Sequence, residues 1–315
     1  MLNRRLLRVK VMQVLYAHYQ HNETTIQNSE KELFHSISKS LDLYYLYILL
    51  MLEVRDYAIG RIEFGKNKKM ASAEELNPNT RFVTNKVLSK FAESEQVSKY
   101  MDQKGNNWAN YKEVIKSLYA EVIKSQQYKD YLENPENSFE VDKKFIVKLL
   151  EKVIAYFEPI YATFEEQSIY WNDEVEFVLS MVVKTVKSME DEVPVKLMGQ
   201  FKDEDDEDFV KRLFRKAVVN HQDYLDLIKK HSKNWDVERV AFMDIILMQI
   251  ALAELVEFPN IPVKVSMNEY IEIAKHYSTD KSGVFINGIL DKAIVELTEA
   301  KKIKKVGRGL VDGAK

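Results

Sequence analysis

Cysteine is absent from this chain of 315 residues, and proline and glycine are scarce, with six and nine copies. Without cysteine the chain can form no disulfide, thiolate nucleophile or cysteine-ligated zinc site, which fits an intracellular compartment. Three of the glycines fall within the last nine residues, so the rest of the chain has few residues that favour turns. Such a chain is expected to be almost entirely helical.

Long apolar runs and glycine-rich phosphate-binding loops are also missing. The longest apolar runs, such as Ile245–Met248, are far too short to cross a bilayer, and the N-terminus lacks the apolar stretch of a signal peptide. No GxGxxG or P-loop motif follows a strand pattern, and the six histidines are scattered. We therefore expect a cytoplasmic protein that is not an enzyme and has no membrane span, cofactor or metal ion.

Positive charge is concentrated at the two ends of the chain. Residues 1–22 carry a net charge of +4, from Arg4, Arg5, Arg8 and Lys10, and residues 301–315 carry +5. The whole chain has a net charge of −3, so the residues between the ends carry −12. Basic ends on an acidic body predict a local site for a polyanion.

Helical hydrophobic periodicity covers most of the sequence. Helices are expected at 3–20, 28–64, 81–101, 107–132, 140–165, 172–188, 208–230, 236–257, 263–277 and 281–300. A turn is expected at 77–80, because Pro78 disfavours helix at the residue before it. The acidic run Lys202–Asp208 lacks the spacing of a calcium-binding loop, so we interpret it as a surface loop.

These patterns divide the chain into four parts. The N-terminal helices occupy residues 1–64, an extra helical region 65–200, a helical core 201–300 and a basic flexible tail 301–315. The three tryptophans, Trp108, Trp171 and Trp235, are almost evenly spaced, and each has a phenylalanine 26 positions earlier (Phe82, Phe145 and Phe209). This spacing indicates either a degenerate two-helix repeat or three unrelated core tryptophans. Both interpretations predict packed helices between residues 65 and 200.

The first expected helix carries a basic face. Arg4 and Arg8 are four residues apart and Arg5 is three before Arg8, and the same row continues to Met12 and Tyr16. Guanidinium groups pair with phosphates and stack on bases, and a tyrosine offers a stacking surface, so the row suits single-stranded RNA. The alternative is a solvated helix start with ordinary surface arginines.

Two segments resemble the NusB family of RNA-binding transcription antitermination factors. Asn3–Tyr16 (NRRLLRVKVMQVLY) is similar to the arginine-rich first helix of that family. Phe285–Lys292 (FINGILDK) is similar to its Phe-Val-Asn-Gly-x-Leu-Asp-Lys pattern, within a resemblance that covers about residues 205–298. The resemblance implies an all-α fold of NusB-like helical bundles, here with additional central helices.

The resemblance also implies a function. It implies that Arg4, Arg5, Arg8, Tyr16, Lys281 and Phe285 bind a single-stranded boxA-like RNA, and that Glu238 contacts ribosomal protein NusE. Some family members carry an acid where this chain has Lys281, and a lysine favours phosphate by its charge. The implied protein is a non-catalytic factor that supports antitermination by RNA polymerase on ribosomal RNA operons.

Two of these side chains have simpler alternatives, and one further residue has an expected structural role. Glu238 lies in the first turn of an expected helix, where an acid complements the helix dipole. Phe285 lies just off the buried stripe of its helix, where a phenylalanine is more often at the edge of the core. Asp244 lies among apolar neighbours, and we expect it to accept buried hydrogen bonds.

Two other functions remain open. One is a helical protein-interaction scaffold that has lost the RNA role. The other is a module that assists an RNA-modifying enzyme in trans, because a related domain is fused to RNA methyltransferases. Affinity for a boxA-like oligonucleotide, measured with and without NusE, distinguishes the scaffold from the antitermination factor.

Overall fold

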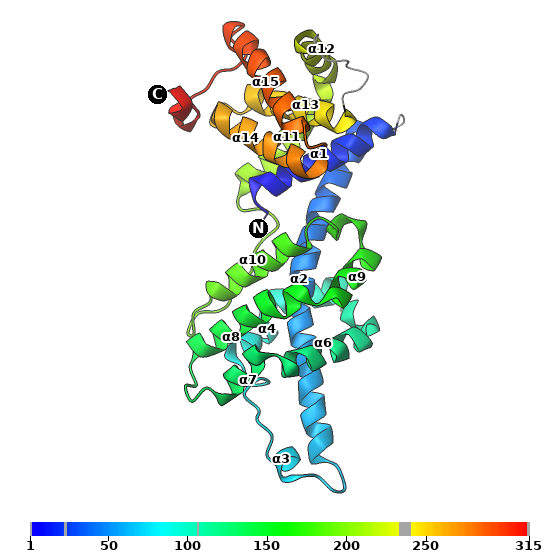
Figure 1. Ribbon diagram of the computed structural model, residues 1–315, viewed down its shortest axis with the longest axis vertical. Coiled ribbons are helices and arrows are strands. Elements are labelled where there is room, and N and C mark those ends of the chain that lie inside the picture. Colours follow the sequence, from blue (N-terminus) through cyan, green and yellow to red (C-terminus); the bar gives the residue numbers. More distant parts are fainter. Residues whose placement is uncertain (1, 22–23, 106, 233–240, 314–315) are drawn as a thin grey trace. The chain divides into compact units, whose positions relative to one another are not determined.

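The computed structural model describes residues 2–21, 24–105, 107–232 and 241–313. Within these ranges every regular element is a helix, which confirms the expected all-α fold (Figure 1). None of the described helices is both long and apolar enough to cross a membrane.

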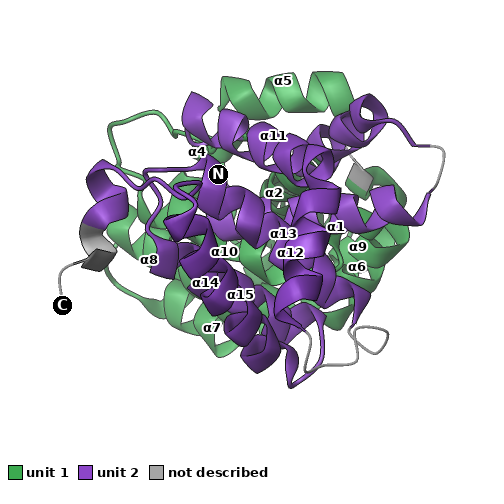
Figure 2. Cartoon of the chain, turned by 90° about the horizontal axis from the view of Figure 1, so that it is seen from above, with its two compact units in different colours: residues 1, 38–200 green, residues 2–37, 201–315 purple. Residues whose placement is uncertain are grey.

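The chain forms two compact units (Figure 2). The central unit comprises Ser38–Gln200, and the terminal unit comprises Leu2–Ile37 together with Phe201–Lys315. The boundary falls inside helix α2 (Ile26–Lys66) and not near residue 64 as expected. The reason is the apolar run of α2 from residue 43 to 52, which is buried in the core of the central unit.

The central unit contains the greater part of α2 and a set of shorter helices. These are α3 (Ala73–Leu76), α4 (Lys86–Ala92), α5 (Glu95–Lys104), α6 (Lys112–Lys124), α7 (Gln126–Glu133), α8 (Phe139–Lys152), α9 (Glu158–Gln167) and α10 (Val175–Lys187), with 3₁₀ turns η1 (Asn107–Asn110), η2 (Ile154–Tyr156) and η3 (Ile169–Trp171). Three of the expected long helices are each divided in two. Ser125, for example, ends α6 and caps α7 by accepting a hydrogen bond from the Tyr128 amide at 3.2 Å. Serine favours such caps because its side chain replaces a missing backbone acceptor.

Two tryptophans connect the other helices of the central unit to α2. The indole Nε1 of Trp108 donates to the Leu46 carbonyl at 2.8 Å, and that of Trp171 donates to the Lys39 carbonyl at 2.7 Å. The ring centroid of Phe164 lies 5.7 Å from that of Trp108 and 5.8 Å from that of Trp171. Each buried indole therefore has its polar atom satisfied, as burial requires.

The corresponding phenylalanines do not occupy equivalent positions. Phe82 lies in the turn before α4, whereas Phe145 lies within α8. Trp235 is outside the described residues. Duplication of a two-helix repeat therefore stays a prediction, and packing accounts for the two described tryptophans.

The terminal unit is organised around helix α13. It contains α1 (Arg4–Gln20), the start of α2, α11 (Glu204–Val219), α12 (His221–His231), α13 (Phe242–Glu257), α14 (Val263–Tyr277), α15 (Ser282–Glu299) and η5 (Gly307–Gly313). Helix α13 packs against α1, α11, α12, α14 and α15, and all its residues from 246 to 255 are buried. A helix covered on every side needs an apolar sequence all round, which explains the run IILMQIALAEL.

The acidic run at 202–208 is not a loop, so the sequence interpretation was wrong. Helix α11 begins at Glu204, and the Asp203 side chain caps it by accepting from the Asp206 amide at 3.1 Å. Acidic residues fill the first turn of α11. Carboxylates stabilise this position because they face the partial positive charge at a helix N-terminus.

Asp244 on α13 holds the turn between α14 and α15. Its side chain is buried and accepts hydrogen bonds from the hydroxyls of Ser278 at 2.6 Å and Ser282 at 2.9 Å. This confirms the expected role of Asp244. The same turn carries Lys281 and leads into Phe285, so the carboxylate fixes the position of both.

Replacing Asp244 with alanine is expected to destabilise the α14–α15 turn by about 2–3 kcal/mol, because the hydroxyls of Ser278 and the buried Ser282 lose their carboxylate acceptor. Amide hydrogen exchange of α13 and α15 measures this local free energy of opening. The matched control is Asp280→Ala, which removes an exposed carboxylate from the same turn and is expected to cost less than about 0.5 kcal/mol. Equal exchange rates in the two variants would contradict the role of Asp244.

Candidate nucleic-acid interface

Helix α1 presents its arginines from a fixed start. The Asn3 side chain caps the helix by accepting from the Leu6 amide at 2.8 Å. Leu7 and Val11 are fully buried, and α1 packs on α11 and α13. The first two turns of α1 therefore stand at a defined place in the terminal unit.

Arg8 is buried in an ion pair with Glu254 of α13. Its Nε and Nη2 donate to the two carboxylate oxygens at 2.7 and 2.6 Å, and the side chains are 3% and 0% exposed. Ser266 and Tyr270 of α14 donate to the same carboxylate, each at 2.7 Å. Burial lowers the pKa of Arg8, but the hydrogen bonds and negative charge of Glu254 outweigh it and hold that pKa above its ordinary value.

Arg4 and Arg5 remain partly exposed, and each is paired with one carboxylate. Arg4 Nε donates to Asp206 at 2.9 Å, and Arg5 makes two hydrogen bonds of 2.8 Å to Glu269. The side chains of Arg4 and Arg5 are 42% and 51% exposed. The hydrogen bond from Arg5 lowers the pKa of Glu269, so the glutamate is ionised near neutral pH. Both arginines can exchange a carboxylate for another anion.

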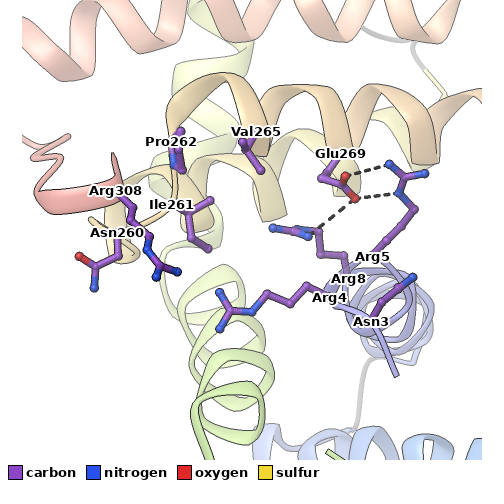
Figure 3. Close-up of a pocket in the computed structure, with 10 residues that line it drawn as sticks. All are labelled: Asn3, Arg4, Arg5, Arg8, Asn260, Ile261, Pro262, Val265, Glu269 and Arg308. Carbon is purple, nitrogen blue, oxygen red and sulfur yellow. Dashed lines mark hydrogen bonds and ion pairs between the residues drawn. The ribbon is translucent and has the colours of Figure 1, made fainter. Parts of the chain in front are cut away.

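The arginines line a cleft of about 650 Å³ (Figure 3). Its walls come from α1, the loop after α13, α14 and η5. The lining residues are Asn3, Arg4, Arg5, Arg8, Asn260, Ile261, Pro262, Val265, Glu269 and Arg308. The cleft thus joins the first helix of the chain to its C-terminal segment, and its volume lies in the range typical of ligand sites.

Tyr16 lies apart from this cleft. Tyr16 is 39% exposed and Phe242 is 37% exposed, and their rings meet edge to face with centroids 5.4 Å apart. Between Arg4 and Tyr16, the row of α1 passes through Arg8 and Met12, which are both buried. The row is therefore not one exposed face, because Arg8 turns inward to Glu254. Its two exposed ends are separated by about 18 Å along the helix axis.

The other predicted contact residues have different surroundings. Lys281 is exposed at the start of α15 and forms no ion pair within the described ranges. Phe285 is 8% exposed, in agreement with the core-edge alternative. Glu238, the predicted partner contact, lies outside the described residues. The structure brings Arg4, Arg5 and Arg8 into one cleft but does not bring Tyr16, Lys281 or Phe285 into it.

Sequence reasoning missed several residues of this site. It assigned no role to Glu254, Glu269 or Arg308, which lie far from α1 in the sequence. The net charge of +5 in residues 301–315 was the available signal for Arg308. The signal for Glu254 was a carboxylate inside the apolar run of α13, because a buried carboxylate needs a partner.

Substituting Arg8 with alanine is expected to lower the stability of the terminal unit by about 3–5 kcal/mol, because Glu254 is left as an uncompensated buried charge. Arg5→Ala, which breaks a partly exposed pair, is expected to cost less than about 1 kcal/mol. Amide hydrogen exchange of α1 and α13 distinguishes the two variants. Equal losses of stability in the two variants would show that burial does not determine how much the Arg8–Glu254 pair contributes to stability.

Comparison with known proteins finds a family match that includes part of the cleft lining. The NusB family matches residues 174–295, from the start of α10 into α15. Transcription antitermination protein NusB of Salinibacter ruber is 41% identical over 104 residues, which are 33% of this chain and 65% of that protein. Its counterpart in Chloroherpeton thalassium is 48% identical over 105 residues, which are 33% and 50% of the two chains. The chain therefore spans less than two thirds of either relative.

A solved structure, T. maritima NusB, is 25% identical in sequence, with a TM-score of 0.30. The match covers 50% of this chain and 95% of the T. maritima chain. The family match includes Glu254 and Glu269 and excludes α1 and η5. Residues 174–295 of this chain are thus similar to the NusB family.

Proposed function

We propose that this protein is a non-catalytic transcription antitermination factor that binds a single-stranded boxA-like RNA together with ribosomal protein NusE. In this role it supports RNA polymerase on ribosomal RNA operons. The relatives that match residues of this chain carry the name transcription antitermination protein NusB. The observation that carries the RNA proposal is the pair of partly exposed arginines, Arg4 and Arg5, at one cleft.

Arg4 and Arg5 suit phosphate because their side chains are 42% and 51% exposed. The partly exposed pair of Arg5 with Glu269 contributes about 0–1 kcal/mol, so replacing Glu269 with a phosphate costs little. Asp206, the partner of Arg4, is 7% exposed, so releasing it costs more. Each phosphate neutralised by an arginine also releases counterions from the RNA. Asn3 and Asn260 lie in the same cleft. The amide of Asn260 offers donors and an acceptor to base edges, and Asn3, whose Oδ1 caps α1, offers the donors of its amide nitrogen.

Arg8 has a different role in this proposal. It lines the cleft, but its guanidinium is held by Glu254 and is 3% exposed. Breaking a buried pair to reach a phosphate costs several times more than breaking a surface pair. Arg8 therefore positions the start of α1, and Arg4 and Arg5 make the phosphate contacts.

The remaining predicted residues extend the interface along the terminal unit. Tyr16 and Phe242 form a partly exposed aromatic pair on which a base can stack. Lys281 offers an exposed positive charge. Phe285 offers little ring surface to a base, and we assign it to packing beneath the turn. Glu238 remains the proposed contact to NusE.

A protein-interaction scaffold is the second candidate, and exposed apolar side chains of the central unit favour it. Phe64, Met70 and Leu76 are 63%, 93% and 54% exposed around the α2–α3 connection. Exposed apolar side chains that form one contiguous patch are typical of partner surfaces. A scaffold that has lost the RNA role has no affinity for RNA with or without NusE, whereas the factor proposed above binds.

The double variant Arg4→Gln, Arg5→Gln is expected to weaken binding of a boxA-like single-stranded RNA at least tenfold. Loss of two phosphate contacts also lowers the slope of log K against log salt concentration by about 1.4. Fluorescence anisotropy of a labelled oligonucleotide, with and without NusE, measures both quantities. The matched control is Lys229→Gln, Lys292→Gln, which removes two exposed positive charges outside the cleft. Equal losses in the two double variants would contradict a specific role for the cleft.

Glu269→Gln is expected to strengthen RNA binding several-fold at pH 7, because it removes the carboxylate that competes with phosphate for Arg5. Arg5 depresses the pKa of Glu269 in the free protein, and a phosphate on Arg5 returns that pKa toward or above its ordinary value of 4.5. The complex therefore takes up a proton as the pH falls. The affinity of the unsubstituted protein approaches that of the variant below pH 4.5. A constant affinity ratio between pH 7 and 4 would argue against competition at Arg5.

A further inference from the structure

The C-terminal segment contributes a fourth arginine to the cleft. Arg308 belongs to η5 and lines the cleft with Arg4, Arg5 and Arg8. In the view of Figure 3, Arg308 and Asn260 lie at one end of the row of lining residues, and Arg5 and Glu269 lie at the other. Arg308 is exposed and lies beyond the family match, which ends at residue 295.

Backbone contacts hold this segment on the loop after α13. The chain leaves α15 with the amides of Lys302 and Ile303 donating to the Leu297 carbonyl, and the Ile303 side chain is buried. Lys305 Nζ then donates to the Phe258 carbonyl at 3.0 Å. The Val306 amide donates to the carbonyl of Pro259 at 3.1 Å. The segment before Arg308 is therefore tied to the residues that begin the cleft wall.

Two glycines flank Arg308, and both are required by the backbone. Gly307 has a φ of +52°, a conformation that side chains with a Cβ rarely adopt. A Cβ on Gly309 would lie 2.0 Å from the Pro259 carbonyl oxygen, so only glycine allows this approach. The Gly-Arg-Gly sequence, interpreted from sequence as part of a flexible tail, here forms a turn that directs Arg308 to the cleft.

The charges of the cleft set Arg308 apart from the other arginines. Arg4 pairs with Asp206 and Arg5 with Glu269, while Arg8 pairs with Glu254 and also lies 3.8 Å from Glu269. Arg308 has no carboxylate partner in the part of the chain that the structure describes. Its charge gives the cleft an excess of one positive charge, and it can bind an anion without first releasing an acid.

We propose that Arg308 binds a backbone phosphate of the RNA and that the segment 306–309 is part of the RNA-binding site. This inference rests on the proposed function and adds a residue outside the family match. Because Arg308 has no acid to displace, the phosphate it binds meets less competition than a phosphate at Arg4 or Arg5. Asn260, in the same loop as Pro259, lines the cleft with it and supplies an amide donor.

The test measures binding of a single-stranded RNA oligonucleotide to the full chain by anisotropy at several salt concentrations. Arg308→Gln is expected to weaken binding about five- to tenfold and to lower the salt slope by about 0.7, the value for one phosphate contact on a single strand. The matched control, Lys304→Gln, removes an exposed charge of the same segment that does not line the cleft, and it is expected to change affinity less than twofold.

A second variant tests the seating of the segment. Gly309→Val places a side chain against the Pro259 carbonyl and displaces Arg308, so it is expected to lose as much affinity as Arg308→Gln. Because both changes remove one contact, the double variant is expected to bind no more weakly than either single variant. Additive losses would overturn the proposed seating of Arg308 by Gly309.

The outcomes separate this inference from the proposed function. If Arg308→Gln binds RNA like the unsubstituted chain while Arg4→Gln, Arg5→Gln does not, the Arg308 assignment is overturned and the RNA function stands. If neither variant changes the affinity for RNA, the Arg308 assignment and the proposed RNA function are both overturned. If Arg308→Gln keeps its affinity for RNA but no longer binds an oligoglutamate peptide, the assignment of Arg308 to RNA is also overturned. That result indicates an acidic protein partner.

Discussion

The buried ion pair between Arg8 and Glu254 is the interaction on which the candidate site depends. It joins residues 246 positions apart, and Ser266 and Tyr270 complete the hydrogen bonding of the carboxylate. The apolar contacts of Leu7 and Val11 bury α1 but leave its rotation about its own axis weakly defined, because apolar packing is not directional. Two parallel hydrogen bonds from a planar guanidinium define that rotation. They therefore also define where Arg4 and Arg5 reach the surface.

Burial then divides four arginines of one cleft into different roles. Arg8 is fixed, because separating a buried pair leaves a charge without solvent or partner. Arg5 is paired with Glu269 at the surface, where the pairing contributes little and is screened by salt. Arg4 is itself partly exposed, although its partner Asp206 is buried. Arg308 is exposed and has no acid to displace within the described chain. An arginine thus fixes a helix, forms an exchangeable ion pair or binds an anion directly, according to how exposed it is to water.

The sequence predicted what depends on nearby residues. Periodicity and the scarcity of glycine predicted the all-α fold, and α14 matches its expected range at both ends. Asp244 was predictable because a carboxylate in an apolar run must find donors. Periodicity shows which residues share a face, but it does not show which part of that face another helix covers. The burial of Arg8 depends on Glu254, and the placement of Arg308 depends on the Pro259 carbonyl, so neither could be predicted from local sequence.

The fold also explains the uneven distribution of charge along the chain. Both basic ends belong to the terminal unit, and every residue that lines the cleft comes from that unit. Bringing these ends together would be unfavourable through mutual repulsion, and acids of α11, α13 and α14 reduce it by pairing with Arg4, Arg5 and Arg8. Because these helices lie between residues 204 and 277, the acidic body supplies the counter-charges for the arginines of α1. Among the arginines that line the cleft, the charge that remains after this pairing is that of Arg308, which makes an anion the ligand that the cleft attracts.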